Sequence, residues 1–156
     1  MDPIHSINAA ILEAYPKQYL YRRVVCAKLF IDEHFASPIN LDDIADEACF
    51  SKFHFARLFR TIYDRTPHQY LTDIRITRSK EFLRNDETIK RACYLVGFDS
   101  LTSFTGLFKR RVGMTPAVFQ RLALNKRDEI VVRPVKFVPN CFVEKRGWDK
   151  IAIFEN

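Results

Sequence analysis

The sequence predicts a mainly α-helical protein in which two helix-turn-helix units are joined by a long linker helix and followed by a short β-rich C-terminal tail. Three observations lead to this fold class. Apolar residues recur at helical spacing between residues 41 and 112, one segment of the chain occurs twice, and β-branched and aromatic residues are frequent in residues 125–156. The length of 156 residues suits one domain or two very small ones.

The second part of the helical region repeats the first. Residues 51–71 and 100–120 share identical residues at an offset of 49, and residues 41–50 and 89–98 share apolar positions at an offset of 48. A unit of about 30 residues therefore occurs twice. The identical pairs are Ser51/Ser100, Phe55/Phe104, Leu58/Leu107, Phe59/Phe108, Thr66/Thr115 and Pro67/Pro116, and the cations Arg60 and Lys109 also align.

The first unit, residues 41–63, is predicted to form two helices around a tight turn. Asn40 can cap the first helix together with Asp43, the turn lies at Cys49, and Ser51 can cap the second helix. Apolar residues at spacings of three and four mark the buried face of each helix. These faces are Leu41, Ile44, Ala45 and Ala48, followed by Phe55, Leu58, Phe59 and Ile62.

The second unit, residues 89–112, follows the same plan. Thr88 is the expected cap of its first helix, Gly97 can adopt the left-handed conformation that ends a helix, and Ser100 opens the second helix. The expected buried faces are Ile89, Ala92, Cys93 and Val96, followed by Phe104, Leu107, Phe108 and Val112.

Between the units, Thr66 followed by Pro67 is a typical helix start, and a linker helix is expected over residues 67–85. Residues 1–21 are expected to form a helical N-terminal extension before a domain at 22–124. In residues 125–156, the stretches EIVVRPVKFVP, NCFVEK and KIAIF favour strands. Such a tail is too short for an independent domain. It is expected to pack on the helices or to pair with a second copy as a weak homodimer.

The distribution of charge favours a nucleic-acid partner. The net charge is +6 and the pI is about 9.3. Residues 51–63 hold three cations and no acid, and residues 100–124 hold four cations and no acid. Positive charge is therefore concentrated around the second helix of each unit, as in proteins that bind a groove of double-stranded DNA. A linker helix of 19 residues spans about 28 Å, close to the 34–36 Å between successive major grooves on one side of DNA.

The side of each second helix opposite its apolar stripe carries the candidate base-reading residues. Arg57 is the strongest candidate, because an arginine can bind guanine through two hydrogen bonds. Phe53 either contacts thymine methyl groups or packs against a neighbouring helix. Because Gly106 has no side chain, we expect the first of the two helices to discriminate bases more strongly. The full candidate set is Phe53, Ala56, Arg57, Leu101, Thr102, Thr105 and Gly106.

A second set of residues is expected to bind phosphates, which contributes affinity and salt dependence without reading sequence. Arg75 and Arg78 of the linker helix are expected either to remain in solvent or to approach the DNA backbone. The predicted phosphate contacts are Ser51, Lys52, Arg60, Ser100, Lys109, Arg110 and Thr115.

Other classes of function find little support. The chain has four glycines and no GxGxxG, P-loop, GxSxG or HExxH motif, so we expect no enzyme and no cofactor. The four cysteines lack metal-binding spacing, and Cys141 has no evident activating neighbour. No run of 18 apolar residues or secretion signal is present, so we expect a cytoplasmic protein with no membrane association and no bound metal.

Together, LDDIADEACFSKFHFARLFR (41–60) and VGFDSLTSFTGLFKRRVGMTPAVFQR (96–121) resemble the AraC/XylS transcription regulators over roughly residues 22–122. The resemblance implies two helix-turn-helix subdomains on one face of the DNA, and activation of transcription through contacts with RNA polymerase. The alternative is a protein-interaction adaptor that keeps the fold without specific DNA binding.

The sequence departs from the family pattern in three ways. Cys49 stands where a small turn residue is often found, at a cost of about 1 kcal/mol if its φ is positive. Gly106 lies within a helix, where glycine costs about 0.5–1 kcal/mol, at a position that can carry a reading side chain in relatives. We expect no large effector-binding domain before the two units, and therefore no control by an inducer bound to a fused domain.

Overall fold

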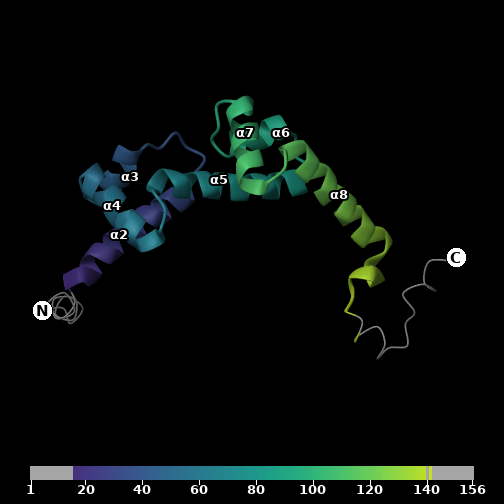
Figure 1. Ribbon diagram of the computed structural model, residues 1–156, viewed down its shortest axis with the longest axis horizontal. Coiled ribbons are helices and arrows are strands. Elements are labelled where there is room, and N and C mark those ends of the chain that lie inside the picture. The colour runs from purple at the N-terminus through teal and green to yellow at the C-terminus, as the bar shows by residue number, and fades with distance from the viewer. Residues whose placement is uncertain (1–15, 140, 142–156) are drawn as a thin grey trace, which may run out of the picture.

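The computed structural model describes residues 16–139 and 141, and those residues form helices and no strand. In Figure 1 helix α5 crosses the centre, with α2, α3 and α4 at one end and α6 and α7 at the other, while α8 leads away toward the C-terminus. The helices are α2 (Pro16–His34), α3 (Leu41–Glu47), α4 (Lys52–Tyr63), α5 (Pro67–Arg84), α6 (Ile89–Leu95), α7 (Leu101–Val112) and α8 (Pro116–Val132), followed by the 3₁₀ helix η1 (Pro134–Phe137).

The predicted helix caps are present at most of the expected positions. Asn40 Oδ1 accepts hydrogen bonds from the backbone nitrogens of Asp42 and Asp43 at 2.7 and 3.1 Å, and the Asp43 side chain accepts one from Asn40 N at 2.8 Å. This reciprocal pair satisfies backbone donors that the first turn of α3 would otherwise leave unpaired. Thr66, Thr88, Ser100 and Thr115 also cap their helices through side-chain oxygens.

The two turns between helices share an unusual backbone conformation. Cys49 has a φ of 49° and Gly97 a φ of 81°, and these residues are equivalent at the offset of 48. The positive φ predicted for Gly97 is confirmed. Cys49 adopts the left-handed conformation without being glycine, which costs about 1–2 kcal/mol. The repeat therefore keeps the geometry of the turn even where its residue type has changed.

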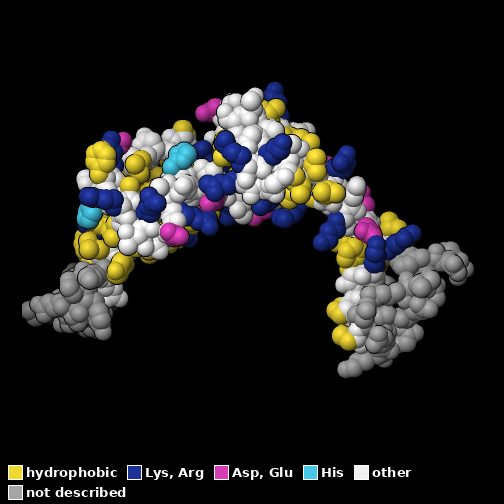
Figure 2. Space-filling view, in the orientation of Figure 1, with side chains coloured by type: hydrophobic (Ala, Val, Ile, Leu, Met, Phe, Trp, Pro, Cys, Tyr) yellow, Lys and Arg dark blue, Asp and Glu magenta, His cyan; other side chains and the backbone are white. Residues whose placement is uncertain are grey.

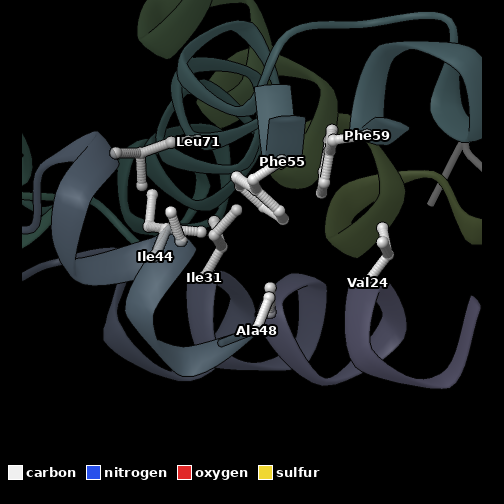
Figure 3. Close-up of a cluster of buried hydrophobic side chains, with 9 residues drawn as sticks. Val24, Ile31, Ile44, Ala48, Phe55, Phe59 and Leu71 are labelled. Carbon is white, nitrogen blue, oxygen red and sulfur yellow. The ribbon is translucent and has the colours of Figure 1, made fainter. Parts of the chain in front are cut away.

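The first hydrophobic core lies where α2, α3, α4 and the beginning of α5 meet. Figure 3 shows its labelled side chains directed toward one another, with Phe55 near the middle of the cluster. Phe55 and Phe59 are completely buried, as the apolar spacing of α4 predicts. The buried members are Val24, Ala27, Ile31, Ile44, Ala45, Ala48, Phe55, Phe59 and Leu71.

A second core, formed by α5, α6 and α7, repeats this arrangement. Cys93 is one of its members, and burial raises the pKa of its thiol, with Asp99 adding to the effect. The thiol is therefore held in its neutral form and behaves as a small apolar side chain. The buried members are Ile76, Leu83, Ala92, Cys93, Val96, Phe104 and Phe108.

Aromatic contacts show that the duplication extends to packing. The ring centroids of Phe55 and Phe59 are 5.5 Å apart, and those of the equivalent Phe104 and Phe108 are 5.7 Å apart. One turn into the following helix, Tyr70 lies edge-on to Phe59 at 5.7 Å, and Phe119 lies edge-on to Phe108 at 5.6 Å. Helix α8 thus has the same relation to the second unit as α5 has to the first.

Helix α5 contributes to both cores. Leu71 belongs to the first core, whereas Ile76 and Leu83 belong to the second. Phe35, from the segment after α2, packs against both clusters. The two units are therefore joined by a helix that packs in both cores, and not by a flexible linker.

The prediction of β structure is wrong for the part of the tail that the structure describes. Helix α8 continues through residues 125–132, and η1 follows at Pro134–Phe137. The β-branched residues Ile130, Val131 and Val132 are exposed on the helix, so their strand preference is overridden by continuation of the helix from Pro116. Pro134 follows the helix end, where a residue without a backbone N–H is tolerated.

Because residues 125–137 form no strand, they offer no strand edge through which the expected homodimer could pair. The stretch KIAIF and most of NCFVEK lie outside the described residues. At the other end, residues 16–21 of the expected helical extension begin α2, and residues 1–15 lie outside the described part.

Candidate nucleic-acid interface

One side of α4 is open to solvent while the other side packs into the first core. Phe53 is 73% exposed and Arg57 is exposed, whereas Ala56 is partly buried. Of the two alternatives for Phe53, packing against a neighbouring helix is therefore not observed. Its ring lies 5.8 Å from the Lys52 ammonium group, so an aromatic face and a cation stand together on the outside of the helix.

The equivalent side of α7 is also open. Leu101 is 41% exposed, Thr102 is exposed and Thr105 is partly buried. A Cβ atom built on Gly106 would meet no other atom within 4 Å. The candidate base-reading residues thus form one open face on each unit. Apart from Leu101, the face on α7 consists of small residues, two of which carry hydroxyl groups.

The predicted phosphate-binding residues lie around these two faces. Arg60, Lys109 and Arg110 are exposed, and Figure 2 shows Lys and Arg side chains over both units. Lys52 forms an ion pair with Asp42 of α3, with Nζ and Oδ1 3.1 Å apart. Such an exposed pair is weak and can exchange partners readily.

The hydroxyl groups in this set differ in how they are used. Ser51 is exposed and its side chain makes no capping hydrogen bond, although it precedes α4. Ser100 Oγ accepts a hydrogen bond from Ser103 N at 3.4 Å, and Thr115 Oγ1 accepts one from Val118 N at 3.4 Å. A hydroxyl can accept a second hydrogen bond and donate one, so capping leaves capacity for a phosphate.

Sequence reasoning missed an arginine that secures the first turn. Arg23 of α2 donates from Nε to the carbonyl oxygen of Ala48 at 2.6 Å and also binds the carbonyl oxygen of Cys49. Its guanidinium group stacks 4.0 Å from the centroid of Phe50. Arg23 therefore satisfies carbonyl groups at the end of α3 and fixes the turn that precedes α4.

Arg75 has a related role between the units: it is partly buried, so the expectation that it remains in solvent is wrong, whereas an approach to the DNA backbone stays a prediction. Its Nε and Nη2 donate to the carbonyl oxygens of Phe35 and Ser37 at 2.7 and 2.9 Å. Its guanidinium group lies 5.6 Å from the ring of Phe98, the equivalent of Phe50. Burial lowers the pKa of Arg75, an effect that Asp99 partly opposes. Arg75 therefore ties the segment after α2 to the turn of the second unit.

A second connection between the units converges on Asp73, in the middle of α5. Arg65, which follows α4, places Nη1 2.7 Å from Asp73 Oδ2. Arg111, in the last turn of α7, places Nε 3.3 Å from Asp73 Oδ1. One carboxylate thus binds a cation just after α4 and a cation in the last turn of α7. No sequence signal identified this group, because it depends on how α4 and α7 pack against α5.

Comparison with known proteins identifies the family. A family described as a helix-turn-helix domain matches residues 44–122, just over half of the chain. Among solved structures, an AraC-type transcriptional regulator from Chromobacterium violaceum superposes with a TM-score of 0.62 at 21% identity, covering 66% of this chain and 93% of that one. The chain belongs to the AraC/XylS family.

Two further relatives of this AraC/XylS-family protein extend the comparison. The HTH-type transcriptional regulator YdeC of Bacillus subtilis is 31% identical over 94 residues, which are 60% of this chain and 32% of YdeC. The DNA-binding domain of AdpA, solved in complex with a target DNA, gives a TM-score of 0.65 at 23% identity, covering 68% of this chain and 96% of that one. The match spans about a third to just under half of the curated relatives' length.

Within residues 16–139 and 141, neither a metal-binding cluster nor a membrane-spanning helix is found. No cluster of three or more His, Cys, Asp or Glu side chains is arranged to hold a metal ion among these residues. None of their helices combines the length and the apolar character needed to cross a bilayer. The exposed sides of α4 and α7 are therefore taken as the candidate functional site.

Proposed function

We propose that this AraC/XylS-family protein is a sequence-specific double-stranded DNA-binding regulator of transcription that inserts α4 and α7 into adjacent major grooves. The observation that carries the proposal is the position of the two helices relative to α5. Both end near Asp73, whose single carboxylate reaches Arg65, just after α4, and Arg111, in the last turn of α7. That contact supports a common side of α5 for the two helix ends, as simultaneous docking on one face of a duplex requires.

The residues on the open faces suit the chemistry of a major groove. Arg57 can donate two hydrogen bonds to guanine, and Phe53 can contact the methyl group of thymine. On α7, Thr102 and Thr105 offer hydroxyl and methyl groups, while Gly106 lets the helix backbone approach the base edges closely. The known complex of the AdpA domain with a target DNA supports the same use of this fold here.

Charge supports DNA over other partners. Residues 51–63 and 100–124 contain cations and no acid, so the second helix of each unit attracts a polyanion along its exposed side. The alternative of an adaptor without DNA binding leaves this concentration unexplained. A gel shift with random duplex at two salt concentrations separates them, because only a DNA binder gives a shift that weakens as salt rises.

The deciding experiment is selection of bound duplexes from a random pool, followed by footprinting. We expect a non-palindromic site with protection in two adjacent major grooves on one face, bound by one chain. Protection of a single groove, or a palindromic site bound by two chains, would contradict the two-helix arrangement while leaving DNA binding intact.

The effect on transcription is proposed from the family resemblance. Activation through a contact with RNA polymerase predicts more transcript from a template with the selected site when the protein is added to purified polymerase. A fall in transcript from the same template would instead identify a repressor.

A further inference from the structure

The group formed by Asp73, Arg65 and Arg111 has features of a ligand-binding site. The Asp73 side chain is 21% exposed, whereas those of Arg65 and Arg111 are 57% and 41% exposed. Each guanidinium group uses only part of its donor capacity on the carboxylate, since arginine has five N–H donors. The pair therefore presents free donors to solvent on either side of a single negative charge.

The position of the pair determines what it would meet in the complex, and this step rests on the proposed function. Arg65 follows the end of α4 and Arg111 lies at the end of α7, so the pair stands between the two reading helices. When two helices occupy successive major grooves on one side of a duplex, a minor groove and its flanking phosphates lie between them. The pair is thus placed to face that central stretch of backbone.

We propose that Arg65 and Arg111 form a phosphate-binding pair for the DNA backbone between the two major grooves. Asp73 orients the two guanidinium groups before DNA binds and limits their affinity for phosphate. Arginine matches phosphate through paired hydrogen bonds. Both guanidinium groups are exposed, so water screens their attraction to the partly buried Asp73 and a phosphate can displace it from one of them. The Asp73 carboxylate then repels the nearby phosphates and so lowers the affinity for DNA.

The proposal predicts opposite effects for the two kinds of residue. R65Q and R111Q should each weaken binding to all duplex sequences alike and reduce the slope of log affinity against log salt by about 0.9, one phosphate contact each. D73N keeps the size of the side chain and removes its charge. It should raise affinity several-fold for selected and random duplexes, most at low salt, where charges are least screened.

A matched control is available on the same helix. Arg78 and Glu81 also form an exposed ion pair, with Nη1 and Oε2 3.2 Å apart. Arg78 lies about 140° around the helix axis from Asp73, so it points away from the proposed contact. R78Q and E81Q should therefore leave the salt slope at its original value. Thermal unfolding of each variant checks that the fold is retained.

A triple variant tests whether Asp73 acts through the two arginines. In the R65Q/R111Q background, most of the gain from D73N should disappear if the carboxylate competes for these side chains. The proposal is overturned if R65Q and R111Q leave the salt slope unchanged, or if D73N weakens binding, since Asp73 would then serve mainly to position the units. These results require that the original protein binds duplex DNA; failure of that binding would instead overturn the proposed function.

Discussion

At the scale of single residues, the two glycines at positions 97 and 106 solve different problems. A Cβ atom on Gly97 would lie 2.6 Å from the carbonyl oxygen of Ala36 and 3.1 Å from Arg75 Nη2. Glycine is therefore needed both for the backbone conformation and for the close approach of the two units. At Gly106 there is no such crowding, so inside the protein glycine is not required there and lowers helix stability, whereas its proposed benefit is close approach to DNA.

The same substitution should consequently have opposite effects at these two positions. Gly97→Ala is expected to lower the free energy of unfolding by about 2 kcal/mol or more, because a left-handed alanine costs about 1–2 kcal/mol before the contact with Ala36 is considered. Gly106→Ala is expected to raise it by about 0.5–1 kcal/mol. Urea denaturation followed by circular dichroism measures both. Similar values for the two variants would contradict the tight packing of the second turn.

Arg57 and Lys109 provide a second matched pair at this scale. Arg57→Ala should cost about 1–3 kcal/mol of binding to the selected site and relax the preference at one base position. Lys109→Ala should weaken every duplex alike and lower the salt slope by about 0.9. Fluorescence anisotropy with a set of single-base variants at several salt concentrations distinguishes the two. A uniform loss for Arg57→Ala would place that side chain on a phosphate.

At the scale of helices, α4 and α7 are equivalent in packing but unequal in chemistry. The aromatic contacts beneath them have nearly the same ring distances, whereas Arg57 on α4 has Gly106 as its counterpart on α7. We expect the base pairs contacted by α4 to tolerate fewer substitutions than those contacted by α7. A binding scan over all single substitutions of the selected site tests this asymmetry, and stronger discrimination in the α7 half would refute it.

The helices also show what the sequence could predict. The caps at Asn40, Thr88 and Ser100 and the buried stripes were predictable, because they depend on residues within a few positions of one another. The strands expected around Ile130 failed for a physical reason. β-branched residues favour strands only when a sheet is present to pack them, and here the helix begun at Pro116 simply continues.

The contacts that join the units were not predictable in this way. Arg75 binds backbone carbonyl oxygens, which leave no trace in the residue types, and its partners come from the segment after α2. Asp73 binds Arg65 from the segment after α4 and Arg111 from α7, whose relative positions follow from the packing of both cores. The base-reading and phosphate-binding residues remain predictions, although the open faces on which they lie could be inferred from the opposite, buried stripes.

At the scale of the whole molecule, the sharing of α5 by both cores limits independent motion of the units. Leu71 and Ile76 anchor opposite halves of the same helix. A base pair inserted between the two half-sites turns the second groove by about 34–36° and moves it by about 3.4 Å. We expect this insertion to lower affinity about tenfold or more, as one helix loses its groove.

Anisotropy measurements with the lengthened site check this expectation, and a base pair inserted outside the half-sites serves as the control. Unchanged affinity for the lengthened site would mean that the two units can rotate relative to each other. If the expectation holds, the target carries a constraint that no base contact imposes. Mutations that insert or delete a base pair between the two half-sites would then abolish regulation as effectively as substitutions of the base pairs that the protein contacts.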